Sequence, residues 1–262
     1  MAFSDILSAI FWMPLNLSLV HTNSLLIGGQ LGQALCKLVF FFGNVSLFVS
    51  IQNLILIAVD RFGAVVFPLR SPLIRPKVSP FFILATWIVA VAISSLSLIA
   101  GDIVESPGGT SCVMKWEKVF GESLSSASIV LAHDILQIYI PVLLLAIVYS
   151  IIITKLKTQA HPGEQSANTQ QQRKRRNRNV LQMSIAIVTV FVFCWLPFSI
   201  NVLIIAYKDR STHLSCSFWL YFTVTAHMSN AYYAINPIIC FIFSSNYRQA
   251  LKRLIKCSSA QA

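Results

Sequence analysis

Long apolar stretches alternate with short polar segments along the chain. Four stretches run for roughly 20 residues or more without Asp, Glu, Lys or Arg: 38–59, 81–100, 180–207 and 214–245. A helix of about 20 residues crosses the hydrocarbon core of a bilayer, where a free peptide group finds no hydrogen-bond partner. The stretches are also too long for the strands of a membrane barrel. Each therefore predicts a membrane-spanning α-helix.

Two further stretches carry polar residues and still predict spans. The stretch 127–153 contains His133, Asp134 and Gln137, and the shorter stretch 6–20 follows Asp5. Together the six stretches predict an all-α membrane helix bundle over residues 1–246. The spans are expected at about 2–22, 33–66, 80–100, 127–156, 177–207 and 214–243. Residues 247–262 predict a short amphipathic helix and a cytoplasmic tail.

The composition agrees with a membrane protein. Of the 262 residues, 56% are hydrophobic and only 11% are charged, whereas a soluble chain carries about 25% charged residues. There are too few polar side chains to cover a globule in water, so lipid must cover the surface instead. This excludes a soluble secreted domain and a disordered chain.

The basic residues indicate which side of the membrane each loop faces. The net charge is +11, and most Lys and Arg lie in the segments 70–77, 155–178 and 248–256. The opposite segments, 102–122 and 208–210, hold both signs of charge. Because cytoplasmic loops collect Lys and Arg, the first set and both termini are expected in the cytoplasm.

The basic run 173–178 admits two interpretations. Taken alone, it is typical of a nuclear signal or an RNA-binding patch. Between two spanning helices it is explained by topology and by attraction to an anionic leaflet, so no nucleic-acid partner is expected. The stretch 163–172 just before it is rich in Gln, Asn and Ser and predicts a flexible linker.

The cysteines fall into groups once the sides of the membrane are assigned. Cys36, Cys112 and Cys216 lie at or beyond the outer face, where disulfides persist. Cysteines inside the membrane, at 194 and 240, are typically small apolar fillers. Cys257 follows a basic amphipathic stretch and is a candidate for palmitoylation.

The chain resembles the rhodopsin-like (class A) G-protein-coupled receptors. The resemblance covers nearly the whole sequence and lies in an ordered set of motifs. These are Asp5; the pair Cys36 and Cys112; Asp60-Arg61-Phe62 in place of Asp-Arg-Tyr; Trp87; Pro141 with Tyr149; Phe191, Cys194, Trp195 and Pro197 in the pattern F-x-x-C-W-x-P; Asn236-Pro237; and Tyr247-Arg248. Any one motif is weak evidence, but the ordered set is specific.

The resemblance implies a disulfide between Cys36 and Cys112 and a polar centre at Asp5, Ser50 and Asn236. In this family the positions of the polar centre hold a sodium ion with water, which favours the resting state. From the residues alone, an acid within the bilayer marks a polar cavity. The alternative is a neutral carboxylic acid in a helix interface. No other metal and no cofactor are expected.

At the cytoplasmic end the resemblance implies a latch. Arg61 rests against Asp60, beside Phe62, and turns toward Tyr149 and a G protein on activation. Many relatives add an acidic partner at the base of the following inner helix, but 177–179 reads Asn-Arg-Asn here. The second restraint is therefore not expected, which predicts raised basal activity.

A set of apolar and proline residues is expected to act as an activation switch. Pro197 removes a backbone hydrogen bond and kinks its helix, so a small shift near Trp195 becomes a larger swing of the cytoplasmic end. The expected members are Ile51, Pro141, Phe191, Cys194, Trp195, Pro197, Asn236, Pro237 and Cys240. Cys240 stands where the family has the tyrosine of N-P-x-x-Y, which puts the usual stabilisation of the open form in doubt.

The ligand cavity is expected near the outer ends of the spans. Gly43 stands where amine receptors place an aspartate, so a monoamine bound in the usual way is not expected. The adjacent His133 and Asp134 indicate a polar cavity and a cationic ligand group, or else an acid that faces a neighbouring helix. The expected lining is Gly43, Asn44, Leu47, His133, Asp134, Gln137, Phe198, Asn201, His227 and Asn230. A peptide ligand is preferred on the strength of the resemblance.

These features predict a multi-pass receptor of the plasma membrane and not an enzyme. It would bind an extracellular ligand and activate a heterotrimeric G protein through outward movement of the span 177–207. The family has seven spans and six are found, so the first helix is expected to be absent, from either a fragment or a truncated receptor. A truncated, non-signalling chain that dimerises with a full receptor is one alternative. A small transporter or channel is another, but the repeated halves and paired intramembrane charges typical of transporters are not seen.

Overall fold

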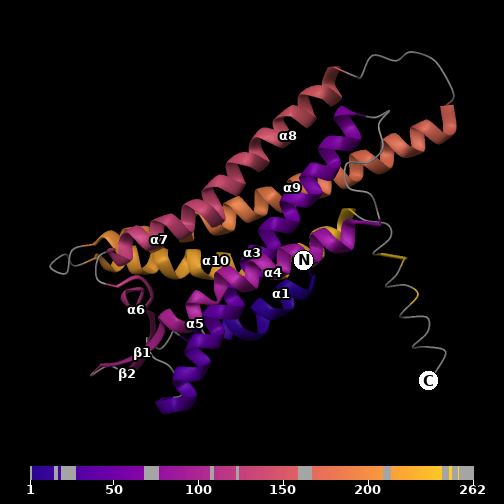
Figure 1. The fold of residues 1–262 in the computed structure, drawn as a ribbon. Helices are drawn as coiled ribbons and strands as arrows, with labels where there is room; N and C mark the ends of the chain where they lie inside the picture. The colour runs from indigo at the N-terminus through magenta and orange to yellow at the C-terminus, as the bar shows by residue number, and fades with distance from the viewer. Residues whose placement is uncertain are drawn as a thin grey trace, which may run out of the picture.

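The computed structural model describes residues 2–14, 17–18, 28–67, 77–106, 109–121, 124–158, 167–208, 214–243, 248–249 and 253. Its long helices lie alongside one another as a bundle (Figure 1). The α-helices are α1 (Ala2–Leu7), α3 (Gly29–Val66), α4 (Ser79–Ser94), α5 (Leu96–Ala100), α6 (Glu117–Phe120), α7 (Ser126–Asp134), α8 (Ile140–Thr158), α9 (Ala167–Tyr207) and α10 (Cys216–Phe243). Two segments are π-helical, η1 (Ser8–Trp12) and η2 (Ile135–Tyr139), and the strands β1 (Gly101–Ser106) and β2 (Gly109–Met114) form an antiparallel hairpin. The predicted helical-bundle fold is confirmed.

Four of the described helical stretches are long and apolar enough to cross a membrane: Gly29–Val66, Ser79–Ala100, Ser126–Thr158 and Arg178–Tyr207. Large apolar side chains cover their outer faces, and on α4 the residues Phe81, Leu84 and Ile88 are 70%, 58% and 60% exposed. Such a surface is an aggregation hazard in water. In a membrane the same surface is stable, because apolar side chains then contact apolar lipid chains.

Two stretches differ from the sequence-based expectation. The helix expected at 80–100 is interrupted at Ser95, whose hydroxyl donates to the Ala92 carbonyl oxygen at 2.7 Å instead of pointing to solvent. The helix α9 begins at Ala167, so the linker expected at 163–172 is wrong from residue 167 onward. The added residues are mostly Gln, Lys and Arg, which favour helix and include neither Gly nor Pro.

A hydrophobic core joins the inner faces of α3, α8, α9 and α10. Its most deeply buried members include Leu54, Leu145, Ile152, Ile187 and Phe191, none more than 1% exposed. A side chain buried to this degree contributes roughly 1.5–3 kcal/mol relative to exposure in water. In a membrane the gain is smaller, because the alternative surroundings are also apolar, and close packing of the helices supplies the remainder.

Buried serines hold α1 and the start of η1 against α3. Ser4 Oγ lies 3.1 Å from Ser50 Oγ, and Ser8 Oγ donates to Ser46 Oγ at 2.7 Å. The Ser46 hydroxyl also contacts the Ser4 carbonyl oxygen. Small hydroxyl side chains let two helix backbones approach closely and satisfy their own polar groups across the interface. All four serines are fully buried, so this contact is shielded from lipid and water.

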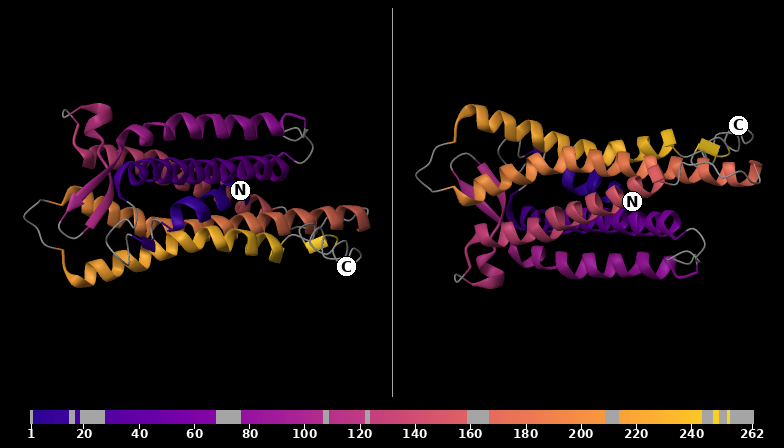
Figure 2. Two further views of the ribbon diagram at one scale, coloured as in Figure 1. Left: turned by 90° about the horizontal axis from the view of Figure 1, so that it is seen from below. Right: turned by 90° about the horizontal axis from the view of Figure 1, so that it is seen from above.

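The hairpin lies at the end of the bundle where α9 ends and α10 begins (Figure 2). Its strands pair with Ile103 opposite Cys112. The Gln33 side chain on α3 donates to the Gly101 carbonyl oxygen at 3.2 Å and accepts from the Ile103 N–H at 3.1 Å. The disulfide between Cys36 and Cys112 is present, with the two Cα atoms 5.6 Å apart, which confirms the predicted pair.

Two lysines that follow the hairpin form ion pairs with Asp102 on β1. Lys115 Nζ lies 2.8 Å and Lys118 Nζ 2.9 Å from Asp102 Oδ2. Hydrogen bonds from both ammonium groups hold the pKa of the Asp102 carboxyl well below its usual range. The short helix α6, which carries Lys118, is thereby tied to the start of β1.

Candidate functional site

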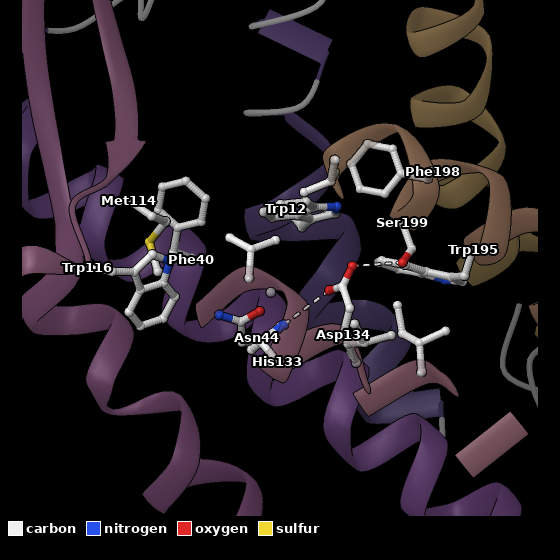
Figure 3. A pocket seen from close by; sticks show the side chains of 15 residues that line it. Trp12, Phe40, Asn44, Met114, Trp116, His133, Asp134, Trp195, Phe198 and Ser199 are labelled. Atoms are coloured by element: carbon white, nitrogen blue, oxygen red, sulfur yellow. Dashed lines mark hydrogen bonds and ion pairs between the residues drawn. The ribbon is translucent and has the colours of Figure 1, made fainter. Parts of the chain in front are cut away.

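A cavity of about 280 Å³ lies between the helices next to the end of β2 (Figure 3). Its walls come from η1, α3, α7, η2, α9 and the segment that ends β2. The lining residues are Trp12, Phe40, Gly43, Asn44, Leu47, Met114, Trp116, Val130, His133, Asp134, Ile138, Trp195, Phe198, Ser199 and Val202. This volume is near the lower end of the range for ligand pockets, about 300–1,000 Å³. The cavity therefore suits a side chain or one end of a larger ligand.

Both π-helical segments border the cavity. The segment η1 ends at Trp12, and η2 follows directly after Asp134 and contains Ile138. A π turn inserts an extra residue into a helix, and such turns are frequent at functional sites. The inserted residue rotates the side chains that follow it. The two turns thus help to decide which side chains reach the cavity.

Asp134 brings a carboxylate into the cavity wall although it is only 7% exposed. Ser199 Oγ donates to Asp134 Oδ2 at 2.7 Å, and His133 Nδ1 lies 3.4 Å from Oδ1. Figure 3 shows the carboxylate between these two side chains. The Tyr139 hydroxyl lies 2.9 Å from Ser199 Oγ, so a chain of contacts links η2, α9 and α7. Asp134 both lines the cavity and contacts a neighbouring helix through Ser199, and the cationic ligand group expected from the sequence stays a prediction.

Trp12 lies directly against α3 at Gly43. A Cβ atom added to Gly43 would lie 2.8 Å from Trp12 Cε3, closer than carbon atoms approach without a shift. Trp12 also contacts Phe40, one turn earlier on α3, with the ring centroids 6.1 Å apart. Glycine at this position therefore leaves the room that the indole needs.

Substitution of Gly43 by alanine is expected to displace the Trp12 indole and to cost about 1–3 kcal/mol, because the site is already filled. The measurement is the melting temperature of the purified chain, compared with that of Gly28→Ala. The nearest atom to a Cβ at Gly28 is Thr110 Oγ1 at 3.8 Å, an ordinary contact. Equal melting temperatures for the two variants would contradict the close approach of Trp12.

Six residues of the expected lining do lie in the cavity wall: Gly43, Asn44, Leu47, His133, Asp134 and Phe198. The expectation is corrected for Gln137, Asn201, His227 and Asn230, which are outside it. Gln137 is 1% exposed and buried within the π turn of η2. Asn201 Nδ2 donates to Thr225 Oγ1 at 2.9 Å between α9 and α10. His227 and Asn230 lie on α10, from which no described residue reaches this wall.

The sequence reasoning missed half of the wall. The residues not expected are Trp12, Phe40, Met114, Trp116, Val130, Ile138, Ser199 and Val202, and Trp195 was expected only as part of the switch. Ser199 could have been predicted from the sequence, because it lies four residues after Trp195, on the same face of the helix. Met114 and Trp116 reach the cavity through the hairpin, which the sequence analysis did not predict.

Three of the expected switch residues, Ile51, Phe191 and Cys194, lie in one buried cluster with Trp195, which also lines the cavity. The Trp195 ring centroid lies 6.3 Å from that of Phe191 and 6.0 Å from that of Phe198. A ligand that presses on Trp195 therefore presses on packed core side chains and not on empty space.

Two tyrosines that the sequence reasoning missed extend this stack to α10. The Tyr233 ring lies 6.1 Å from Trp195, and the Tyr232 ring lies 5.3 Å from Phe191, both edge to face. The sequence feature that could have predicted them is their position four residues, or one helical turn, before Asn236 and Pro237. The remaining switch residues are Pro141, buried in α8; Pro197, within α9; and Asn236, Pro237 and the half-buried Cys240, on α10.

The structure brings the polar-centre residues together between α1, α3 and α10. Asp5, Ser50 and Asn236 are each at most 6% exposed, and Ser50 bonds to Ser4, the neighbour of Asp5. Among the described residues, Asp5 Oδ1 and both amide atoms of Asn236 have no hydrogen-bond partner. Carboxylate, hydroxyl and amide oxygens suit a hard cation, so these residues fit a sodium ion.

The latch residues lie at the other end of the bundle. Arg61 Nε donates to Asp60 Oδ2 at 3.1 Å, and a second guanidinium nitrogen contacts the same oxygen. Phe62 packs at the edge of the core. Tyr149 is buried on α8, within electrostatic range of Arg61. This is the arrangement expected of a closed latch.

The end of α10 is covered by a basic side chain. Arg248 Nη1 donates to the carbonyl oxygens of Phe241 and Ile242 at 3.0 and 2.5 Å. Arginine in this place satisfies carbonyl groups that the last helical turn leaves open. Most of the amphipathic segment expected at 247–262, including the lipidation candidate Cys257, lies outside the described residues.

These features define a membrane helix bundle with a cavity at one end and the Asp60–Arg61 pair at the other. The model of the 7 transmembrane receptor (rhodopsin family) matches residues 1–240, and the chain belongs to this family. This is a family of multi-pass membrane receptors and not of enzymes.

The chain is similar in sequence to several receptors of this family. The chain is 30% identical to the somatostatin receptor type 5 of Bos taurus, in a match that covers 97% of this chain and 65% of that protein. It is 26% identical to galanin receptor 2b of Danio rerio, over 98% and 64%, and 30% identical to the RYamide receptor of Drosophila melanogaster, over 97% and 54%. The chain thus spans less than two thirds of the length of these relatives.

Proposed function

We propose that this chain is a G-protein-coupled receptor for an extracellular peptide, placed in the plasma membrane with its C-terminus in the cytoplasm. The observation that carries the proposal is the continuous packing from the cavity into the core. Trp195 lines the cavity and stacks on Phe191, and Phe191 contacts Tyr232 near the polar centre. A ligand in the cavity thereby acts on side chains that join α9 to α10.

A peptide is the ligand class that the relatives favour. The similar receptors are named for somatostatin, galanin and RYamide. The cavity is small, and Met114 and Trp116 place the charged outer loop at its wall. One side chain of a peptide fits the cavity while the rest of the peptide lies against the loop.

The movement that we propose is an outward swing of the cytoplasmic half of α9. Pro197 lies within α9, directly between the cavity residues Trp195 and Phe198, and removes a backbone hydrogen bond there. The helix bends most easily at this point. An outward swing would separate α9 from α3 and α8, which frees Arg61 to meet a heterotrimeric G protein.

We also propose that Asp5, Ser50 and Asn236 hold a sodium ion in the resting state. When bound, the ion supplies a positive charge beside the Asp5 carboxylate. The three residues come from α1, α3 and α10, so coordination by all of them favours one arrangement of these helices.

The proposal predicts a response to at least one peptide of a defined panel. The panel consists of somatostatin, galanin, substance K, RYamide and allatostatin A, and the readout is energy transfer between this chain and a heterotrimeric G protein in cells. Trp195→Ala is expected to abolish the response, because it removes the link between cavity and core. Trp219→Ala, an exposed tryptophan on α10, serves as the matched control and is expected to keep it.

Silence toward every peptide of the panel would contradict the proposal. If the silent chain also lowered the signal of a co-expressed full-length receptor, a chain that acts by dimerisation would be favoured instead.

A further inference from the structure

The carboxylate in the cavity wall has no lysine or arginine partner among the described lining residues, and the basic side chain nearest to it there is that of His133. Asp134 accepts one short hydrogen bond, from Ser199 Oγ at 2.7 Å, and the contact with His133 Nδ1 is long at 3.4 Å. A carboxylate offers about four acceptor sites. Among the described residues that line the cavity, none is Lys or Arg. Acceptor capacity and negative charge are therefore left over in a site where an unpaired charge is costly.

Aromatic rings form much of the remaining wall. They belong to Trp12, Phe40, Trp116, Trp195 and Phe198. The faces of such rings attract ammonium and guanidinium groups, and the attraction is stronger where water is excluded. A carboxylate and several rings around one small cavity favour a cation, whereas an anion would need basic side chains in the wall.

We propose that the cavity binds a cationic group of the peptide, an ammonium or guanidinium that pairs with Asp134 while its apolar stem lies against Trp12 and Trp195. This inference rests on the proposed function and adds the chemistry that the ligand must carry. The acid comes from α7, across the cavity from Gly43 on α3. The indole of Trp12 occupies the space beside Gly43.

The same carboxylate connects the bound cation to α9. Ser199 donates to Asp134 from α9, and Tyr139 in η2 contacts Ser199. A cation at Asp134 would share the carboxylate with Ser199, so its position is coupled to that of α9. The contact between α7 and α9 therefore changes when the site fills, one helical turn from Trp195.

The variant Asp134→Asn separates this role from a purely structural one. Asparagine keeps the size of the side chain and an acceptor for Ser199, and it removes the charge. Glu105→Gln is the matched control, because Glu105 is exposed on β1, outside the cavity, and loses the same charge.

The probes are capped single residues added to the purified chain in lipid nanodiscs. They are N-acetyl-arginine amide, N-acetyl-lysine amide and the uncharged isostere N-acetyl-citrulline amide. Norleucine amide is compared with its N-acetylated form to test whether the bound cation is a terminal amine. Saturation-transfer NMR gives the dissociation constants. A single opposite-charge contact with ring faces around it is expected to make at least one cationic probe about tenfold tighter than its uncharged counterpart.

This preference is expected to persist in Glu105→Gln and to disappear in Asp134→Asn. Equal binding, or no binding, of charged and uncharged probes by the unmodified chain overturns the inference, as does a preference that survives in a folded Asp134→Asn. If that variant does not fold, Val130→Lys replaces it. A lysine in the wall supplies an internal cation and is expected to exclude the charged probes; undiminished binding overturns the inference. The binding measurement needs no G protein. A chain that binds the cationic probe more tightly but does not signal would therefore contradict the proposed function and leave the inference about the cation standing.

Discussion

Replacement of Arg61 by alanine is expected to abolish ligand-driven activation of the G protein while the receptor still reaches the cell surface. Arg61 lies in the last two turns of α3, at the end that the proposed topology places in the cytoplasm, and it is paired with Asp60. The side chains of Arg61 and Asp60 are 22% and 31% exposed, so both reach the surface and loss of the pair leaves no fully buried charge; the fold should therefore tolerate the change. The guanidinium is a fixed charge with several donors, and alanine replaces none of them.

Energy transfer to the G protein measures the activation, and labelling of intact cells measures the amount at the surface. Lys155→Ala, on α8, is the control for loss of one basic residue from a helix end that also faces the cytoplasm in the proposed topology. Arg61→Lys is expected to restore only part of the response, because an ammonium keeps the charge without the planar fork of donors. Undiminished coupling of Arg61→Ala would refute the latch.

Loss of the Cys36–Cys112 disulfide is expected to destabilise the receptor by up to about 4 kcal/mol. The bond closes a loop with a sequence separation of 76 residues, so it removes much freedom from the unfolded chain. It also anchors β2 to the start of α3, next to the ion pairs of Asp102 with Lys115 and Lys118. The hairpin should therefore leave the cavity mouth in the reduced chain.

The test is the melting temperature of Cys36→Ser, Cys112→Ser and the double variant. The two single variants are expected to lose equal stability, and the double variant no more than either, because all three lose the same bond. Cys216→Ser, an exposed free cysteine, controls for the change of residue. Independent, additive losses would show that each cysteine acts by itself.

The membrane-spanning helices could be predicted because one physical requirement dominates them. Lipid demands long apolar stretches with satisfied backbone groups, and α3 and α9 are readable from run length alone. The resemblance to a receptor family then predicted the disulfide between Cys36 and Cys112. The spacing of the cysteines along the chain does not predict that pairing. The residues of the polar centre, latch and switch also came from that resemblance, and the structure shows the contacts among them.

The cavity could be predicted only in part, because its shape depends on backbone details that leave little trace in sequence. The π turns of η1 and η2 rotate their side chains by an amount that helical spacing does not anticipate, so Gln137 faces the core and Trp12 meets Gly43. The hairpin had a weak signal in Pro107 and two glycines at 108–109, between short β-branched segments. That signal does not show that Trp116 reaches the cavity.

The serine pairs between α1 and α3 also set the register of the two helices. Ser4 meets Ser50 and Ser8 meets Ser46, so one further turn along the antiparallel pair brings Trp12 to Gly43. Sliding one helix along the other would break these pairs and re-form them only after a whole turn, about 5.4 Å away. Hydroxyl groups that lie outside the cavity wall therefore fix the depth of Trp12 in the cavity, and we expect a substitution among them to change the selectivity for the proposed ligand.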